Sequence, residues 1–173
     1  FVGTKGGLQG KMERDLIDYY QLAKDGYCTI TDLSSGIINT DQVLDYIESY
    51  VSKNQLDVQA ICYDPYAIHG VLAEMERRGW YYDLYEIRQG PATLSNPTLD
   101  FRLNVINGEI KHEKNPLLDR AVKNAIAKDT NDSIMIEKKM HREKIDPLMS
   151  TLFAYVIAYK YEWDKETFMP MFF

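Results

Sequence analysis

The stretch VQAICYDP, residues 58–65, decides the fold of this chain. Residues 58–63 form an apolar, β-favouring run, which is typical of a strand in the middle of a covered sheet. This strand is predicted to end at Asp64. A helix is predicted from Pro65 to Gly79, and the next strand is predicted over 82–88. The order strand, helix, strand predicts a right-handed parallel crossover.

The segment before this unit predicts two helices and a short strand. Apolar residues recur at helical spacing over about 11–24, and a glycine stop follows them. A short strand is predicted over 27–30. The second helix is predicted over about 40–52, with its cap near Asn39 or Thr40.

The segment after the crossover mixes helical and strand patterns. A helix is predicted around 99–106, and a hairpin is predicted to pair 121–127 with 133–137. The last helix is predicted to run from Pro147 to about Lys160, and its apolar residues on most sides indicate that it is buried. These patterns together predict an α/β fold, a mixed sheet flanked by helices.

Composition indicates one globular domain over residues 1–173, because 45% of the residues are hydrophobic and no linker or repeat divides them. The net charge of -6 excludes a protein whose whole surface attracts nucleic acid, although a local basic groove or bound divalent ions suit a phosphate backbone.

Cys28 and Cys62 are predicted to be buried thiols in a reducing compartment, which indicates the cytoplasm. No stretch approaches the ~20 apolar residues of a membrane span. The apolar tail 168–173 is expected to fold back or to meet a partner.

Two aspartates, Asp64 and Asp146, stand directly before prolines where helices are predicted to begin. Aspartate is a favoured N-cap residue and proline a favoured first helical residue, so each pair is explained by helix-start chemistry alone. Asn96-Pro97 and Asn115-Pro116 are interpreted as the same device with a neutral cap.

The same two aspartates are also candidates for a shared metal site. Asp64 is predicted at the carboxyl end of a central strand, and Asp146 at the start of a buried helix that can converge on the same edge of the sheet. Two adjacent carboxylates repel each other unless a proton or a cation bridges them. Oxygen ligands favour Mg²⁺ or Mn²⁺, and a pair of such ions can promote phosphodiester hydrolysis.

Basic residues precede the second aspartate and form either the rim of a site for an anionic substrate or a solvated hairpin arm. These residues are Lys138, Lys139, Arg142 and Lys144. Other chemistries lack support in the sequence. The glycine-rich start departs from a phosphate-binding loop at its first glycine and at Met12, and the three histidines do not pair with cysteines at zinc-ligand spacing.

The residues themselves resemble a known family through the order of several short pieces along most of the chain. These pieces are Tyr-Asp-Pro-Tyr at 63–66, Gln89-Gly90 followed by Leu94-Ser95-Asn96-Pro97, His112 with Asn115-Pro116, Asn124 ahead of a hairpin, and Lys144-Ile145-Asp146 before an apolar helix. The ordered set resembles the C-terminal nuclease domain of bacteriophage terminase large subunits, the motors that package viral DNA.

This resemblance implies a ribonuclease H-like fold and a metal-dependent endonuclease that cuts concatemeric double-stranded DNA with two Mg²⁺ or Mn²⁺ ions. It implies that Asp64 is the acid of the central strand and Asp146 the late acid on the helix. The partners it implies are viral DNA, the terminase small subunit and the portal protein, with no membrane, in the cytoplasm of the bacterial host.

The chain departs from the family in one respect that concerns the site. The family carries a first acidic residue on the opening strand, and that strand lies upstream of the region that matches Phe1. We therefore expect a truncated domain without its ATPase motor, which binds metal weakly and cleaves little by itself.

Two alternatives remain open from the sequence. In the first, the chain is a non-catalytic interaction module that docks on a portal or capsid-side partner, and both Asp-Pro pairs are only caps. In the second, it is another ribonuclease H-like enzyme, such as a resolvase or integrase, which explains the segment from Gln89 to Asn115 less well.

Overall fold

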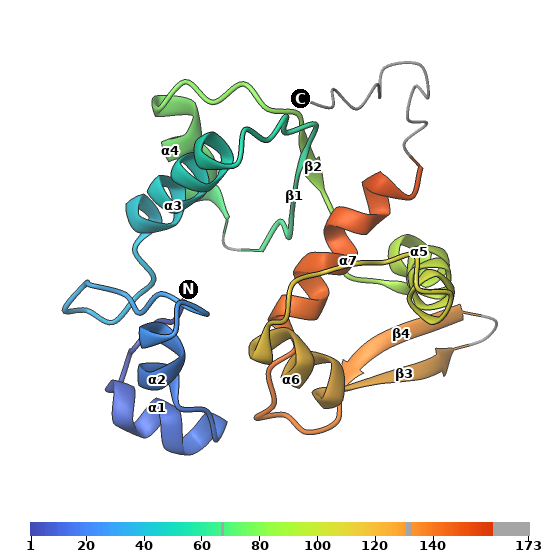
Figure 1. The fold of residues 1–173 in the computed structure, drawn as a ribbon, viewed down its shortest axis with the longest axis horizontal. Coiled ribbons are helices and arrows are strands. Elements are labelled where there is room, and N and C mark those ends of the chain that lie inside the picture. Colours follow the sequence, from blue (N-terminus) through green and yellow to red (C-terminus); the bar gives the residue numbers. More distant parts are fainter. Residues whose placement is uncertain (67, 131–132, 161–173) are drawn as a thin grey trace, which may run out of the picture.

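A computed structural model describes residues 1–66, 68–130 and 133–160 of the chain (Figure 1). The helices are α1 (Leu8–Asp15), α2 (Tyr19–Lys24), α3 (Thr40–Lys53), α4 (His69–Arg77), α5 (Pro91–Ile106), α6 (Pro116–Asn124) and α7 (Asp146–Ala158). The strands are β1 (Ile61–Tyr63), β2 (Leu84–Glu86), β3 (Ala125–Thr130) and β4 (Ser133–Lys138). No helix in these ranges is long and apolar enough to cross a membrane.

The strands form two small sheets. β1 and β2 are parallel, with Ile61 opposite Leu84 and Tyr63 opposite Glu86, and α4 lies between them in the chain. This confirms the predicted strand, helix, strand unit, although each strand has only three residues. β3 and β4 form an antiparallel hairpin in which Ala125 pairs with Lys138. The fold is therefore α/β, as predicted.

Helix α7 lies at the centre of the molecule, between the β1–β2 pair and helices α5 and α6 (Figure 1). Its mean hydropathy is high because apolar residues occupy most of its faces, and this explains why it is buried. The main hydrophobic core forms around it. Core residues from α7 and its neighbours are Ile87, Leu94, Ala121, Ile145, Leu148, Met149, Leu152, Phe153 and Val156.

A second, smaller cluster holds the N-terminal segment together. It consists of Val2, Ile17 and Tyr19, with partly buried residues around them. The prediction of one helix over 11–24 is wrong, because Leu16 adopts a left-handed conformation (φ 53°) that ends α1 and separates it from α2. The predicted strand over 27–30 is reduced to a single parallel bridge between Val2 and Ile30.

The predicted helix at 40–52 is confirmed as α3, and Asn39 caps it by accepting a hydrogen bond from the backbone N–H of Asp41 at 3.0 Å. Helix α4 begins at His69, so the prediction of a helix from Pro65 is wrong at its start. Arg78 at the end of α4 joins α4 to α3 through ion pairs with Asp41 and Asp45.

The C-terminal half differs from its prediction in two places. Helix α5 begins at Pro91 and contains Pro97 in its interior, so Asn96-Pro97 is not a helix start. Residues 121–124, predicted as part of a hairpin strand, belong to α6, and β3 begins only at Ala125. Asn115 caps α6 as predicted. The tail 168–173 lies outside the described residues.

Candidate functional site

Asp64 follows the last residue of β1, and both of its carboxylate oxygens accept hydrogen bonds. One oxygen accepts from the backbone N–H of Tyr66 at 2.8 Å. The other accepts from the side-chain amide of Gln89, just beyond β2. Asp64 therefore closes a turn, and α4 starts only at His69. The interpretation of Asp64 as a helix cap is wrong.

Asp146 is the first residue of α7, and its carboxylate is not used to cap the helix. The N-cap residue is Ile145, and no side chain accepts a capping hydrogen bond there. Asp146 is exposed, while its neighbours Ile145 and Leu148 are buried. The helix dipole favours a negative charge at this position, but the cap interpretation is wrong here too. The backbone of Asp146 is thus fixed by the core, and its oxygens are open to a ligand.

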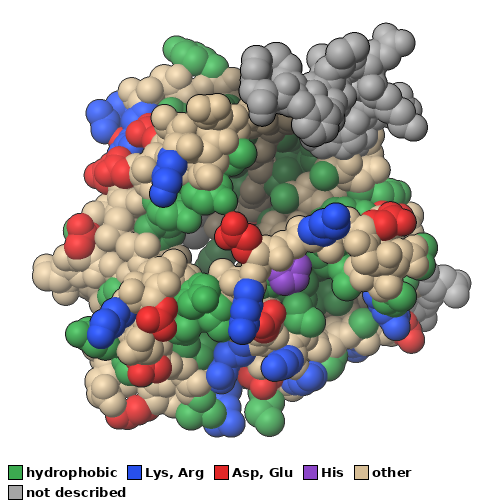
Figure 2. Space-filling view, viewed as in Figure 1, with side chains coloured by type: hydrophobic (Ala, Val, Ile, Leu, Met, Phe, Trp, Pro, Cys, Tyr) green, Lys and Arg blue, Asp and Glu red, His purple; other side chains and the backbone are tan. Residues whose placement is uncertain are grey.

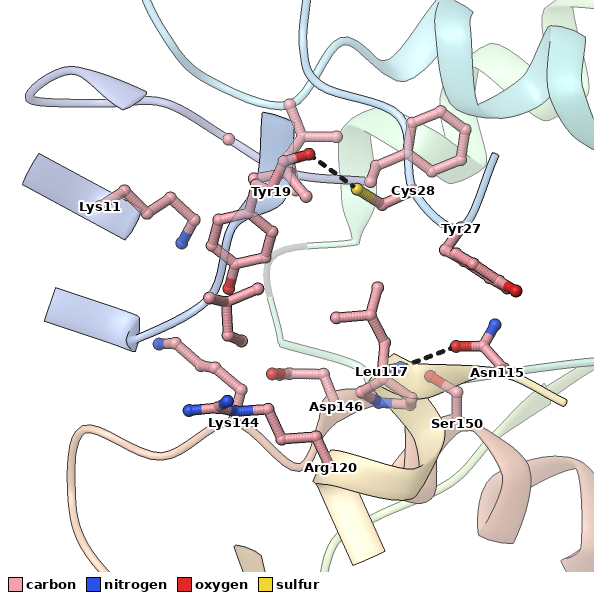
Figure 3. Close-up of a pocket in the computed structure, with 16 residues that line it drawn as sticks. Lys11, Tyr19, Tyr27, Cys28, Asn115, Leu117, Arg120, Lys144, Asp146 and Ser150 are labelled. Carbon is pink, nitrogen blue, oxygen red and sulfur yellow. Dashed lines mark hydrogen bonds between the residues drawn. The ribbon is translucent and has the colours of Figure 1, made fainter. Parts of the chain in front are cut away.

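A cavity of about 480 Å³ lies beside Asp146, between the N-terminal segment and the first turns of α6 and α7 (Figure 3). Its charged lining side chains are Lys11, Arg120, Lys144 and Asp146. Polar and apolar side chains, among them Tyr19, Val2 and Leu117, complete the wall. Asp64 is not part of this lining, so the cavity brings only one of the two candidate carboxylates together with cations.

Asp15 forms a buried polar cluster behind the cavity wall. Its carboxylate accepts a hydrogen bond from the Tyr19 hydroxyl at 2.9 Å and pairs with Lys11 at 3.0 Å. Burial alone raises the pKa of Asp15, but the hydrogen bonds from Lys11 and Tyr19 outweigh it, so the pKa lies below its usual value. The positive charge of Lys144 acts in the same direction.

The same cluster raises the pKa of Tyr19. Burial is the largest cause, followed by the hydrogen bond to Asp15 and by the negative charges of Asp15 and Asp146. The charge of Lys144 therefore lowers the pKa of Asp15, and the charge of Asp146 raises the pKa of Tyr19. Figure 3 shows the side chains of Tyr19, Lys144 and Asp146 directed toward the same space.

The predicted basic residues do not all reach this place. Lys138, Lys139 and Arg142 are exposed, and the Lys139 ammonium donates to the backbone carbonyl of Lys123. Lys144 is half-buried and lines the cavity with Asp146. Figure 2 shows lysine and arginine side chains gathered on the lower middle of this face, below a hollow.

Sequence reasoning missed Arg120 and Tyr19, which line the cavity together with Asp146, and Asp15, which bonds to Tyr19 behind the cavity wall. Arg120 fell in a segment adjoining the predicted hairpin, although the cap signal of Asn115-Pro116 indicated a helix that carries it. Asp15 and Tyr19 fell within one predicted helix, and no glycine in the sequence marks the break at Leu16 that separates α1 from α2.

The donor atoms fit a divalent cation in kind. Asp64 and Asp146 offer carboxylate oxygens, which Mg²⁺ and Mn²⁺ prefer. Within residues 1–66, 68–130 and 133–160, no group of three or more His, Cys, Asp or Glu side chains is placed to hold an ion. Both cysteines are free and half-buried, and burial raises the pKa of each thiol.

Comparison with known proteins finds a family and a solved structure that are similar to this chain. A family model described as "Terminase large subunit, endonuclease domain" matches residues 2–162. The crystal structure of the large terminase of bacteriophage HK97 is similar in fold, with a TM-score of 0.75 and 18% sequence identity over 86% of this chain. That alignment spans 30% of the HK97 chain. No curated protein matches the chain. The structural likeness confirms the predicted α/β fold and shows that it is shared with the HK97 large terminase.

Proposed function

Because the chain belongs to the family of terminase large subunit endonuclease domains, we propose that it hydrolyses phosphodiester bonds of double-stranded viral DNA. The observation that carries this proposal is Asp146, an exposed carboxylate on a helix that packs in the main core, unused in capping and beside a cavity with cationic side chains. A fixed carboxylate is what a hydrolytic metal site requires.

Asp64 and Asp146 are the residues that would hold Mg²⁺ or Mn²⁺ ions. Bound ions of this kind activate a water molecule and stabilise the leaving oxygen in phosphodiester cleavage. Two aspartates do not fill the coordination shells of two ions, so further ligands come from water, from DNA oxygens or from another carboxylate.

The protein contributes orientation at both carboxylates. Gln89 and the Tyr66 N–H fix the Asp64 oxygens at the end of β1. The core beneath α7 fixes the backbone of Asp146. Lys144 in the cavity lining, and the exposed Lys138, Lys139 and Arg142 outside it, provide positive charge for the DNA backbone.

The biological setting proposed from the family is the packaging of viral DNA. The substrate would be concatemeric DNA, cut at the start and end of packaging in the cytoplasm of the bacterial host. The terminase small subunit and the portal protein would be the partners. The alignment with the HK97 large terminase spans 30% of that chain, so these activities of a whole terminase remain proposals for this one.

The test is plasmid cleavage with Mn²⁺ by the terminase large subunit that carries this domain. We expect Asp64→Asn and Asp146→Asn each to abolish cleavage, because each removes a charged ligand but preserves side-chain shape. Asp83→Asn is the matched control, since Asp83 is exposed and lies just before β2. Normal cleavage by either Asp64→Asn or Asp146→Asn would show that the site assignment is wrong.

A second measurement separates a nuclease from an interaction module. An ion that binds only the folded state raises the thermal midpoint, by an amount set by its concentration relative to its Kd. We expect Mn²⁺ to raise the midpoint of the wild-type protein and of Asp83→Asn, and to raise it less in Asp146→Asn. A midpoint that Mn²⁺ shifts equally in all three proteins would contradict metal binding at Asp146.

A further inference from the structure

Two cations line the cavity beside Asp146 without a carboxylate partner. Within the described ranges of the chain, no carboxylate lies at ion-pair distance from Arg120 or Lys144. Lys11, the third cation of the lining, differs because Asp15 pairs with it at 3.0 Å. Two of the three cationic side chains in the lining thus have no ion-pair partner within the described residues, although the chain as a whole carries a net charge of -6.

Arg120 is held in position by the N-terminal segment. Its guanidinium donates a hydrogen bond to the backbone carbonyl of Asp15 at 3.1 Å, 105 positions away in the sequence. Leu117, one turn earlier on α6, packs against the cluster of Val2, Ile17 and Tyr19. A carbonyl is neutral, so this contact orients the guanidinium and leaves its charge available.

The surroundings suit an oxyanion. The half-buried positions of Arg120 and Lys144 and the apolar side chains in the wall reduce screening by water, which strengthens an interaction with a phosphate. Arginine presents a planar fork of N–H donors that matches two phosphate oxygens, while lysine acts as a point charge. Figure 3 shows the charged ends of both side chains on the same side of Asp146 in this view.

We propose that Arg120 and Lys144 together bind one backbone phosphate of the DNA and hold it beside Asp146. This inference rests on the proposed function for its substrate, and it adds Arg120 as a positioning residue. The two cations also offset the repulsion between the Asp146 carboxylate and the phosphate.

The experiment measures the binding of a labelled short DNA duplex to the full chain in EDTA, from about 50 to about 200 mM salt. The absence of free divalent ions keeps binding separate from cleavage. The variants are Arg120→Gln and Lys144→Gln, and Lys53→Gln is the control because Lys53 is an exposed cation at the end of α3.

We expect Arg120→Gln and Lys144→Gln each to weaken duplex binding by about tenfold at ~0.1 M salt and to reduce the salt slope by about one unit. Lys53→Gln should change neither quantity. Asp146→Asn should bind the duplex more tightly than wild type in EDTA, because it removes a like charge next to the phosphate.

Arg120→Gln also removes the hydrogen bond to Asp15, so its fold must be followed by a thermal melt. Arg120→Lys keeps the charge and should recover most of the binding, whereas Lys144→Gln breaks no side-chain hydrogen bond that the structure shows. Wild-type affinity and salt slope in Lys144→Gln would overturn the proposal. So would a loss in Arg120→Gln that accompanies a lower melting temperature and is not recovered by Arg120→Lys.

The proposed function and this inference fail in different ways. If the wild-type protein binds the duplex through Arg120 and Lys144 but never cleaves it with Mn²⁺, the phosphate site is supported and the nuclease proposal fails. If cleavage requires Asp146 but Arg120→Gln and Lys144→Gln both bind the duplex as tightly as wild type, the nuclease proposal is supported and the phosphate site is wrong.

Discussion

The end of β1 and the start of α7 each carry one candidate carboxylate, and they are supported in opposite ways. Behind Asp146, α7 buries five apolar side chains in the main core. Behind Asp64, β1 is only half-buried and the three residues of β2 are exposed. Asp64 has two hydrogen-bond donors on its carboxylate, and Asp146 has none from the helix.

This difference teaches that a carboxylate can be positioned in two ways. Apolar packing holds the backbone that carries Asp146, whereas hydrogen bonds orient the carboxylate of Asp64 itself. The α7 backbone is held by apolar burial and by a polar link in which Asn104 of α5 donates to the Tyr155 hydroxyl at 2.7 Å. The end of β1 has little such burial, and its carboxylate is oriented by polar contacts instead. Substitutions in the two regions should therefore have unequal effects on stability.

The largest effect is expected for Leu152→Ala in α7. Leu152 is 1% exposed and lies in the middle of the main core. Its truncation removes buried methyl groups and leaves a cavity, which costs about 2–5 kcal/mol. Urea denaturation measures this change in the free energy of unfolding.

Leu84→Ala in β2 is the matched substitution for the other region. Leu84 is 44% exposed, so we expect a change within about 0.5 kcal/mol in either direction. Equal losses for the two variants would show that the β1–β2 pair is as well supported as α7, and the contrast between the regions would disappear.

The sequence predicts the well-packed region better than the other. The apolar residues on most sides of α7 and the caps of α3 and α6 are local signals, and the structure confirms them. At Pro97 the local signal wrongly predicted a helix start. Helix α5 continues past this proline, and its neighbours Leu94 and Thr98 are buried. Tertiary packing there outweighs the helix-breaking tendency of the residue.

The sequence also predicts only part of the candidate site. Asp64 and Asp146 stand out in the sequence because each precedes a proline, and their role as metal ligands stays a prediction. Their partners come from distant segments: Gln89 lies 25 positions from Asp64, and Arg120 contacts the backbone of Asp15. Contacts of this kind depend on how α6 and β2 are placed, which no local pattern contains.

An intermediate effect is expected for Gln89→Leu, which removes the amide donor to Asp64 and keeps the size of the side chain. An exposed hydrogen bond to a carboxylate contributes about 0.5–1.5 kcal/mol, so stability should fall by at most this amount. Cleavage with Mn²⁺ should fall several-fold more than stability explains, because Asp64 loses its fixed orientation.

Gln9→Leu is the control for this prediction, since Gln9 donates a similar exposed hydrogen bond to Glu13 at 2.9 Å on α1. It should reduce stability by a similar amount and leave cleavage unchanged. If both variants lower cleavage to the same extent, Gln89 has no special role at Asp64.

The smallest effect is expected at Asp15, which supports the far wall of the cavity beside Asp146. Its pKa in the folded protein lies below the usual 3.8, so its contribution to stability is present above that pH. The contribution declines as the pH falls below 3.8 and is lost once the pH passes the lower folded value.

Asp15→Asn keeps one acceptor for the Tyr19 hydroxyl but loses the charge that pairs with Lys11. We therefore expect wild type to melt at a slightly higher temperature than Asp15→Asn near neutral pH, and the two melting curves to converge in acid. If the difference in melting temperature stays constant from neutral pH to below 3.8, the charge of Asp15 does not stabilise the folded protein.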